Sequence, residues 1–352
     1  MQMTKYKLGD LIIQRREKNN NYDVPIRGVS KEGFIRAKQQ EADTSIYNVF
    51  YKYDFVFNPA RMELNSIALN IEYEKALCSS LYEVFYVKDE NIVLPEFLNL
   101  HIKRDEFARH CDYIGLGSAR EYCRFANISE FEIELPPIAV QQEIVDADRQ
   151  IKRRIRLNEQ MVEKLEATAQ ALYRHTFVDN IDKQNLPQGA LGDLVTPQKG
   201  RNIVREDCIE GNVPVIAGGK TPSCFHNQSN TGAPVVTISA SGANAGYVGL
   251  HFNKVWAADC SYIDIDIFPY IYYIYVLLSM SQERLYSMQE GTGQPHIYPR
   301  HIMSLSITLP SNDAIRMFHE KVTPFFRKIN LKQQENIKLT ELQSLLLAKM
   351  GQ

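Results

Sequence analysis

Residues 151–172 read IKRRIRLNEQMVEKLEATAQAL, and residues 325–346, located 174 positions later, read FFRKINLKQQENIKLTELQSLL. Their apolar residues recur at alternating spacings of three and four, which is the pattern of a helix that buries one long stripe. The first stripe consists of Ile144, Ile151, Ile155, Val162, Leu165, Ala169 and Leu172. The second consists of Phe318, Val322, Phe325, Ile329, Leu339, Leu346 and Met350. The sequence therefore predicts two long helices with matching apolar stripes.

Each predicted helix is too long for one small domain to cover its stripe. About 38 residues at roughly 1.5 Å per residue span about 57 Å. We therefore expect the stripes to pack against each other as an antiparallel coiled coil, which would hold the two globular parts at opposite ends. Polar residues interrupt the stripes at Asp148, Asn158, Lys332, Asn336 and Gln343, and the asparagines would disfavour slipped registers. The alternative, that each helix packs only on its own domain, stays open.

The two helices belong to an internal repeat. Leu8-Gly-Asp-Leu11 recurs as Leu191-Gly-Asp-Leu194, and each copy opens a segment of mixed short strands and loops. Each segment nears its end with a Gly-x-Gly turn, at Gly115 and at Gly291, followed by a short strand that runs into Leu-Pro and then a long helix. The predicted fold is α+β with pseudo-twofold symmetry. Its globular domains are residues 1–137 and 181–311, and its helices are residues 138–180 and 312–352.

Composition excludes several classes of protein. A net charge of −2, from 40 basic and 42 acidic residues, rules out a uniformly positive nucleic-acid binder, so any DNA contact must come from local basic patches. No apolar run of about 18 residues predicts a membrane span, and the start MQMTKYKLGD lacks the apolar core of a secretory signal. We expect a cytoplasmic protein. The six cysteines and eight histidines show no metal-ligand spacing, which favours free thiols and no metal.

Two apparent motifs fail on inspection. Gly219-Lys-Thr221 is similar to the end of a phosphate-binding P-loop, but position 214 is proline and Pro222 disfavours the helix that the loop requires. Asn58-Pro-Ala-Arg61 lacks the second proline and the aromatic residue of the amino-methyltransferase motif, and no Gly-rich cofactor turn precedes it. We therefore expect neither nucleotide hydrolysis nor methyl transfer by this chain.

Short strands and polar loops dominate both globular halves. Strands are predicted at Val49–Val56, Leu81–Val87, Pro234–Ile238 and Ser261–Ile267, and helices at Pro95–Phe107 and Tyr270–Tyr286. The loops are rich in Arg, Lys, Asn, Gln and Ser, which hydrogen-bond to base edges and phosphates. Such residues also populate any protein surface, so the loops alone do not decide the function.

Residues 135–145, LPPIAVQQEIV, combined with the repeat, resemble the specificity subunits of type I restriction–modification systems. In that family a target-recognition domain ends in a strand, followed by Leu-Pro-Pro and a Gln-containing start of a long helix. Asp54–Arg61 fits the first recognition domain of the family, and Gly218–Ser223 with Ser239–Gly246 fits the second. The resemblance covers essentially the whole chain. The second copy departs from the pattern, since it reads Leu309-Pro-Ser-Asn-Asp, so the two helix starts are not expected to make identical contacts.

The resemblance implies a DNA-binding subunit without a catalytic site. Family members hold two target-recognition domains apart with their helix pair and read a bipartite target, two short half-sites with a fixed spacer. A separation of roughly 50 to 60 Å exceeds one DNA turn of about 34 Å. The implied partners are double-stranded DNA, two methylation subunits and, in the full complex, restriction subunits. S-adenosylmethionine, ATP and Mg would belong to those subunits and not to this chain.

Loop residues are the predicted DNA contacts. In the first half they are Arg15, Arg16, Arg61, Ser118, Arg120 and Arg124. In the second they are Lys199, Arg201, Lys220, Thr221, Ser241 and Asn244. The competing interpretation is a coiled-coil scaffold whose two heads bind proteins, and it differs from a DNA reader in predicting no steep loss of duplex binding with salt.

Overall fold

The computed structural model describes residues 3–20, 23–37, 43–115, 122–179, 187–291 and 293–350. The chain forms two compact units. Unit 1 is Met1–Ile155 with Ile337–Gln352, and unit 2 is Arg156–Asn336. Each of the long helices, α5 (Ile138–Tyr173) and α9 (Asn312–Lys349), contributes one part to each unit. The fold is therefore described within each unit.

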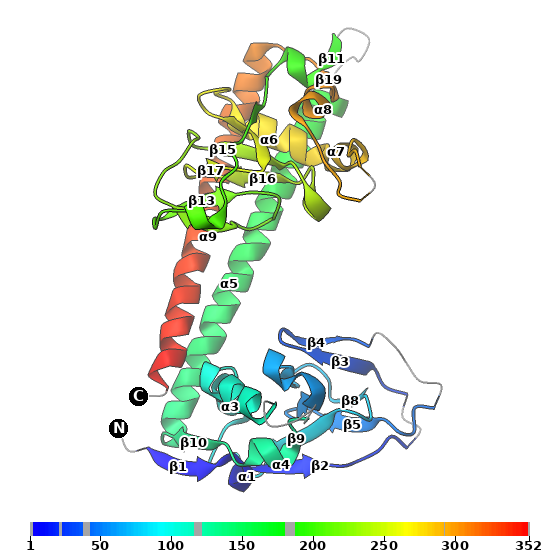
Figure 1. Ribbon diagram of the computed structural model, residues 1–352, viewed down its shortest axis with the longest axis vertical. Helices are drawn as coiled ribbons and strands as arrows, with labels where there is room; N and C mark the ends of the chain where they lie inside the picture. The colour runs from blue at the N-terminus through cyan, green and yellow to red at the C-terminus, as the bar shows by residue number, and fades with distance from the viewer. Residues whose placement is uncertain are drawn as a thin grey trace. The chain divides into compact units, whose positions relative to one another are not determined.

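Unit 1 is built from short, mostly antiparallel strands (Figure 1). One sheet has the strand order β2-β9-β6-β7 and another has the order β4-β3-β8-β5, in which β3 and β8 are parallel. The strands of these sheets are β2 (Ile12–Arg15), β3 (Ile26–Ser30), β4 (Gly33–Arg36), β5 (Asn48–Tyr51), β6 (Phe55–Phe57), β7 (Ile67–Leu69), β8 (Lys75–Cys78) and β9 (Glu83–Val87).

The core of unit 1 joins one sheet to both long helices. Phe55 and Phe85 lie on neighbouring strands and stack with ring centroids 4.8 Å apart. Val145 of α5 and Met350, just beyond the end of α9, are buried in the same apolar cluster. Four shorter α-helices belong to the described part of the unit, namely α1 (Leu8–Leu11), α2 (Pro95–Ile102), α3 (Asp105–Gly115) and α4 (Phe125–Ser129). Both helix ends are therefore anchored in the core of the first domain.

Unit 2 follows the same plan with a different strand arrangement. Its sheets have the orders β12-β18-β15-β16 and β14-β13-β17, and α6 packs on β15 and β16 (Figure 1). The strands are β12 (Gln198–Lys199), β13 (Val213–Ile216), β14 (Cys224–His226), β15 (Val235–Ser239), β16 (Val248–His251), β17 (Trp256–Ala257) and β18 (Cys260–Asp264). The helices besides α5 and α9 are α6 (Ile271–Met280), α7 (Gln282–Ser287) and α8 (Pro299–Met303).

The internal repeat is visible as a two-stranded ribbon in each unit. In unit 1, β1 (Thr4–Lys7) pairs antiparallel with β10 (Glu132–Leu135). In unit 2, β11 (Gln188–Ala190) pairs in the same way with β19 (Ser306–Thr308). The first leucine of each Leu-Gly-Asp-Leu copy directly follows the first strand of the ribbon and is fully buried. The Leu8 N–H donates to the Phe131 carbonyl, and the Leu191 N–H donates to the Leu305 carbonyl. Each ribbon joins the beginning of a domain to the strand that leads into its long helix.

Segments of α5 and α9 run side by side in opposite directions within each unit (Figure 1). In unit 2, Asn158 Nδ2 donates to Asn336 Oδ1 at 2.8 Å. In unit 1, Gln343 Nε2 donates to Asp148 Oδ1 at 2.7 Å. The polar interruptions of the two stripes therefore meet each other. No helix in the described ranges is both long enough and apolar enough to cross a membrane.

Every residue of the two predicted stripes is at least partly buried. Ile151, Ala169, Phe318, Val322, Ile329 and Met350 are buried. The other members are partly buried, namely Ile144, Ile155, Val162, Leu165, Leu172, Phe325, Leu339 and Leu346. The predicted fold class, α+β with two β-rich domains and two long helices packed together, is confirmed.

Three predicted elements are each divided in the structure. Val49–Val56 is not one strand, because Tyr53 adopts a left-handed backbone (φ 66°) in a turn between β5 and β6. The Asp54 carboxylate stabilises this turn by accepting the Tyr51 N–H at 2.8 Å. Pro95–Phe107 is likewise two helices, since α2 ends at Ile102 and α3 begins at Asp105. Tyr270–Tyr286 is also two helices, since α6 ends at Met280 and α7 begins at Gln282.

The amide pair of the seam leads to a stability prediction. Asn158→Leu should lower the free energy of unfolding by about 1–3 kcal/mol, because it removes the hydrogen bond to Asn336 from a buried site. The double variant with Asn336→Leu should lose less than the sum of the two single variants, because two apolar partners can replace the pair. Urea denaturation of all four proteins measures this coupling, and additive losses would contradict it.

Candidate nucleic-acid interface

A large groove of about 1090 Å³ opens on the first domain. Its walls come from the β3–β4 hairpin, the 3-10 helix Pro59–Leu64, the β8–β9 turn and the start of α3. Its basic side chains are Arg27, Lys31, Arg36, Arg61, Lys103 and Arg124, and its acidic ones are Glu32, Glu63, Glu83 and Asp105. The groove thus has a local excess of positive charge, although the chain as a whole is slightly acidic.

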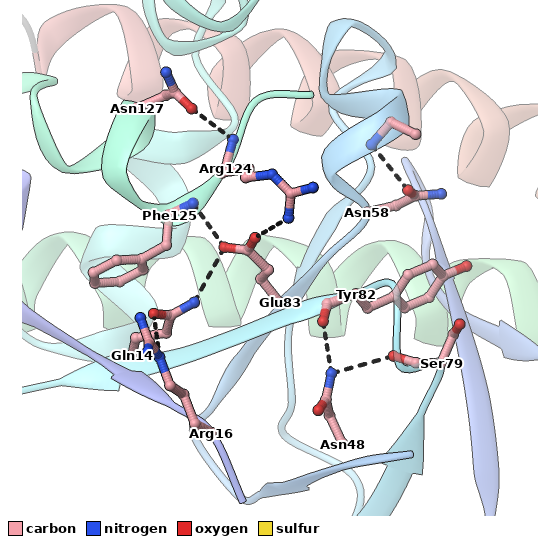
Figure 2. Close-up of polar contacts among 11 residues, drawn as sticks. Gln14, Arg16, Asn48, Asn58, Ser79, Tyr82, Glu83, Arg124, Phe125 and Asn127 are labelled. Atoms are coloured by element: carbon pink, nitrogen blue, oxygen red, sulfur yellow. Dashed lines mark hydrogen bonds and ion pairs between the residues drawn. The ribbon is translucent and has the colours of Figure 1, made fainter. Parts of the chain in front are cut away.

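Arg61 lies at the groove, at a kink within the short 3-10 segment Pro59–Leu64. The Asn58 side chain accepts the Ala60 N–H at 3.1 Å, as Figure 2 shows, and Asn65 ends the helix in a left-handed conformation. The Arg61 side chain is exposed, and its guanidinium makes no hydrogen bond or ion pair with any residue that the structure describes. Its donors are therefore available to a ligand in the groove.

Glu83 lines the groove and connects β9 to β2 and to the segment Arg124–Phe125 (Figure 2). Its carboxylate accepts the Phe125 N–H at 2.7 Å, the Gln14 amide at 3.2 Å and Arg124 Nη1 at 3.3 Å. Arg16 in turn donates from Nε to Gln14 Oε1 at 2.9 Å. Two of the predicted DNA contacts, Arg16 and Arg124, are thus connected through one carboxylate that is only 13% exposed.

Arg15 has a different environment from its neighbour. Its guanidinium donates to both carboxylate oxygens of buried Asp54, at 2.6 and 3.0 Å, and lies over the rings of Tyr51 and Tyr86. Burial raises the pKa of Asp54, and the hydrogen bonds from Arg15 partly offset this. The pair fixes the turn between β5 and β6 to β2. Whether Arg15 also contacts DNA stays a prediction.

The remaining predicted contacts of the first half, Ser118 and Arg120, lie outside the described residues. The predicted contacts do not include Arg27, which donates to the Tyr73 hydroxyl at 2.8 Å, or Lys103, whose pKa is lowered by burial and by the Lys152 ammonium. Both line the groove. The Tyr73 and Lys152 side chains that act on them lie about 50 positions away in the sequence, so no local motif points to these contacts.

In the second domain, the structure brings the predicted loops together around β17 and β18. The Gly200 N–H, between Lys199 and Arg201, donates to the Cys260 carbonyl at 2.8 Å. A side chain at Gly200 would collide with the carbonyl oxygen of Ala258, so only glycine allows this approach. The exposed side chains of Lys199 and Arg201 are thereby held beside the end of β18.

The other two loops of this domain meet at the same place. Ser239 Oγ donates to the Gly218 carbonyl at 3.0 Å, and Ser241 Oγ donates to the Asp259 carboxylate. This brings the Lys220–Thr221 loop beside the turn Gly242–Asn244, in which Gly242 has φ 77°. Sequence reasoning missed Asp259, whose carboxylate orients Ser241.

Lys220 also borders a smaller cavity of about 350 Å³. Its ammonium lies over the Tyr247 ring at 5.3 Å. Deeper in the cavity, Tyr275 donates to Glu166 at 3.1 Å, and burial raises the pKa of that carboxyl. Burial also lowers the pKa of His251 to about 4, so this histidine is neutral near pH 7. The charged side chains that line this cavity are thus Lys220 and Glu166.

Two β-rich domains of similar plan, each with basic side chains on its loops, define a protein suited to binding nucleic acid. The chain belongs to the family described as the type I restriction modification DNA specificity domain, which matches residues 2–167 and 187–341. The resemblance read from the sequence is therefore confirmed, and the two matched segments correspond to the two copies of the repeat.

Two known relatives agree with this assignment. The chain is 30% identical over 126 residues, 35% of its length, to the Type I restriction enzyme HindI specificity subunit of Haemophilus influenzae. It is 22% identical over 300 residues, 73% of its length, to the MjaIX specificity subunit of Methanocaldococcus jannaschii. The matches span 27% of the first relative and 68% of the second.

The fold is also similar to that of a solved S subunit of a type I restriction–modification system from M. genitalium. The TM-score is 0.65, with 15% sequence identity, and the match covers 99% of this chain and 96% of the other. At this level of identity the likeness concerns the fold alone.

The network around Glu83 gives a prediction about discrimination between DNA sequences. Glu83→Gln should reduce the ratio of specific to nonspecific duplex affinity by about tenfold, because Arg124 loses the charge that orients it while the groove gains net positive charge. Binding titrations of the assembled complex at several salt concentrations measure both affinities. Glu63→Gln is the matched control, since Glu63 lines the same groove but is exposed. An equal loss in both variants would contradict the positioning role.

Proposed function

We propose that this chain is the DNA-recognition subunit of a type I restriction–modification complex and reads a bipartite target, two short half-sites with a fixed spacer. The observation that carries the proposal is the duplication: one chain of the specificity family contains two recognition domains, and each has its own basic loop surface. The chain itself has no catalytic role in this proposal. It directs the methylation and restriction subunits to their site in the cytoplasm, and these subunits bind S-adenosylmethionine, ATP and Mg.

The first half-site would be read in the basic groove of unit 1. Arg61 and Arg124 line the groove from two different segments of the chain, and an arginine fork matches the two acceptors of a guanine edge in the major groove. Lys31 and Arg36 on the β3–β4 hairpin are exposed and suit phosphate contacts, which fix orientation but not sequence. A base contact and a phosphate contact in one groove are what specific binding requires.

The second half-site would be read by the loops around β17 and β18 of unit 2. Lys199, Arg201 and Lys220 supply positive charge, and Thr221 and Asn244 supply neutral donors and acceptors. Arginine, lysine and asparagine have distinct preferred base partners. Because the loops of the two domains differ in sequence and backbone, we infer that the two half-sites differ as well.

The helix pair is the proposed spacer and the proposed docking surface for the methylation subunits. Leu157 and Met161 on α5, four positions apart, are 49% and 40% exposed. On the unit 1 part of α9, Leu342 and Leu345 are 51% and 61% exposed. Large apolar side chains in water on one side of a helix favour a protein partner. Restriction subunits would then join through the methylation subunits.

The competing function, a scaffold with two protein-binding heads, uses the same helices but not the basic loops. The two proposals differ in their response to salt. A DNA reader that contacts several phosphates loses duplex affinity steeply as salt rises, whereas a protein scaffold has no such duplex binding to lose. The excess of basic groups in the first groove favours the DNA reader.

Genome-wide mapping of methylated bases tests the function directly. With this chain present, cells should carry methylation at a split motif, and the motif should disappear when the chain is deleted. Arg61→Ala should relax one half of the motif and Lys220→Ala the other, each by about 1–3 kcal/mol of discrimination.

The matched control for these substitutions is Lys52→Ala. Lys52 is exposed and paired with Glu74 outside the groove, so its loss should leave the motif unchanged. A single undivided motif would overturn the bipartite proposal, and a motif indifferent to both Arg61 and Lys220 would remove them from the reading surface.

The docking proposal predicts loss of assembly without loss of folding. Leu342→Glu combined with Leu345→Glu should prevent co-purification with the methylation subunits, because two buried carboxylates at an apolar contact cost several kcal/mol. Circular dichroism should stay unchanged, since both side chains are exposed in the free chain. The control is Ser344→Glu, which adds a carboxylate at a position that lies between the two leucines in the sequence. The complex with this variant should still assemble. Normal recovery of the complex with the double variant would argue against this surface.

A further inference from the structure

Two cysteines of the second domain lie in direct contact at the surface. Cys208 follows the 3-10 helix Arg205–Asp207, and Cys224 begins β14. Their Sγ atoms are 2.7 Å apart. Both residues are half-buried, whereas the other cysteines, Cys78, Cys111, Cys123 and Cys260, are buried. This pair is therefore the one that a reagent in solution can reach among the described cysteines.

The backbone holds the two thiols together independently of the sulfur atoms. The Ile209 N–H, next to Cys208, donates to His226 Nδ1 at 3.0 Å. Cys224 is paired with Val215 in the β13–β14 ladder, and the His226 ring packs edge-on against Trp256 with centroids 5.1 Å apart. Both chain segments are thus fixed on either side of the pair, and forming a bond between the sulfurs requires only a small local adjustment.

The chemical state of the pair makes its oxidation slow. The hydrogen bond with Cys224 is the main cause that raises the pKa of Cys208 to about 11. Because thiolate is the reactive form, a raised pKa keeps this thiol protonated near pH 7. The pair therefore remains a dithiol until one of its thiols loses its proton and meets a disulfide that can oxidise it.

We propose that Cys208 and Cys224 form a reversible disulfide that controls the Lys220–Thr221 loop of the second recognition domain. The oxidant is a low-molecular-weight disulfide. One cysteine thiolate attacks it, forms a mixed disulfide and expels one small thiolate. The second cysteine thiolate then attacks the mixed disulfide, closes the protein S–S bond and expels the other small thiolate. The two protons lost by the cysteines end on the two small thiols, so atoms and electrons balance.

The position of the pair explains why the bond would affect recognition. The two cysteines are 16 positions apart, and the segment between them contains β13 and the loop that carries Lys220 and Thr221. Thr221 stands only three positions before Cys224. A cross-link restricts the conformations of the loop it closes, so the oxidised loop would meet DNA in fewer arrangements. This second step rests on the proposed function, whereas the disulfide itself does not.

The chemistry is tested on the full chain without DNA. The reduced protein is exposed to oxidised glutathione, its free thiols are alkylated, and its peptides are mapped by mass spectrometry. We expect a cross-linked peptide that contains Cys208 and Cys224, removed by dithiothreitol, while buried Cys78 and Cys260 stay reduced. Cys208→Ser and Cys224→Ser should each yield a mixed disulfide with glutathione at the remaining cysteine. Independent modification of the two cysteines in the wild-type chain, without a cross-link, would overturn the proposal.

The effect on recognition is tested on the assembled complex. Methylation of a bipartite substrate should fall about tenfold on oxidation, as expected when one reading loop loses a charged contact, and should recover with dithiothreitol. The Cys208→Ser complex should not respond. If the cross-link forms and methylation is unchanged, the control of the loop is refuted and the disulfide stands. If the reduced complex methylates no split target, it is the proposed function that fails.

Discussion

The apolar stripes of α5 and α9 are too long for a single small domain to cover, so each must be covered largely by the other helix. Within unit 2 this burial involves Val322 and Ile329, and within unit 1 the ends of the helices reach the domain core through Val145 and Met350. Apolar contact alone would tolerate a shift by one or two turns. The amide pair Asn158–Asn336 and the pair Asp148–Gln343 remove that freedom, because a shifted register would separate these buried polar groups.

Sequence periodicity predicted the long helices, the repeat and most of the stripe because these depend on spacing alone. It missed Phe326, which is fully buried, because this residue faces the domain of unit 2 and stacks on Tyr272. Periodicity also did not predict the turn at Tyr53 that divides the predicted strand Val49–Val56, because a left-handed residue does not change the pattern of apolar residues. The candidate site was predicted as types of residue on loops. The sequence could not predict which loops meet, since Glu83 binds residues that lie 69 and 41 positions away along the chain.

Carboxylates accompany the basic side chains in both recognition surfaces. Glu83 orients Arg124 and Gln14, Asp54 binds Arg15, and Asp259 orients Ser241. In these three places a carboxylate lies beside the donors and limits their freedom to move. A rigid donor discriminates better between acceptors than a mobile one, at the cost of weaker general attraction to phosphates.

The ribbons β1–β10 and β11–β19 have one further consequence. In each unit they bring the entry and the exit of the recognition domain to adjacent strands, with Thr4 opposite Leu135 and Gln188 opposite Thr308. A domain whose two ends meet can be exchanged for another with the same ends, without strain on the remaining chain. The fold therefore allows one of these domains to be replaced by another of the same kind while the long helices keep their sequence.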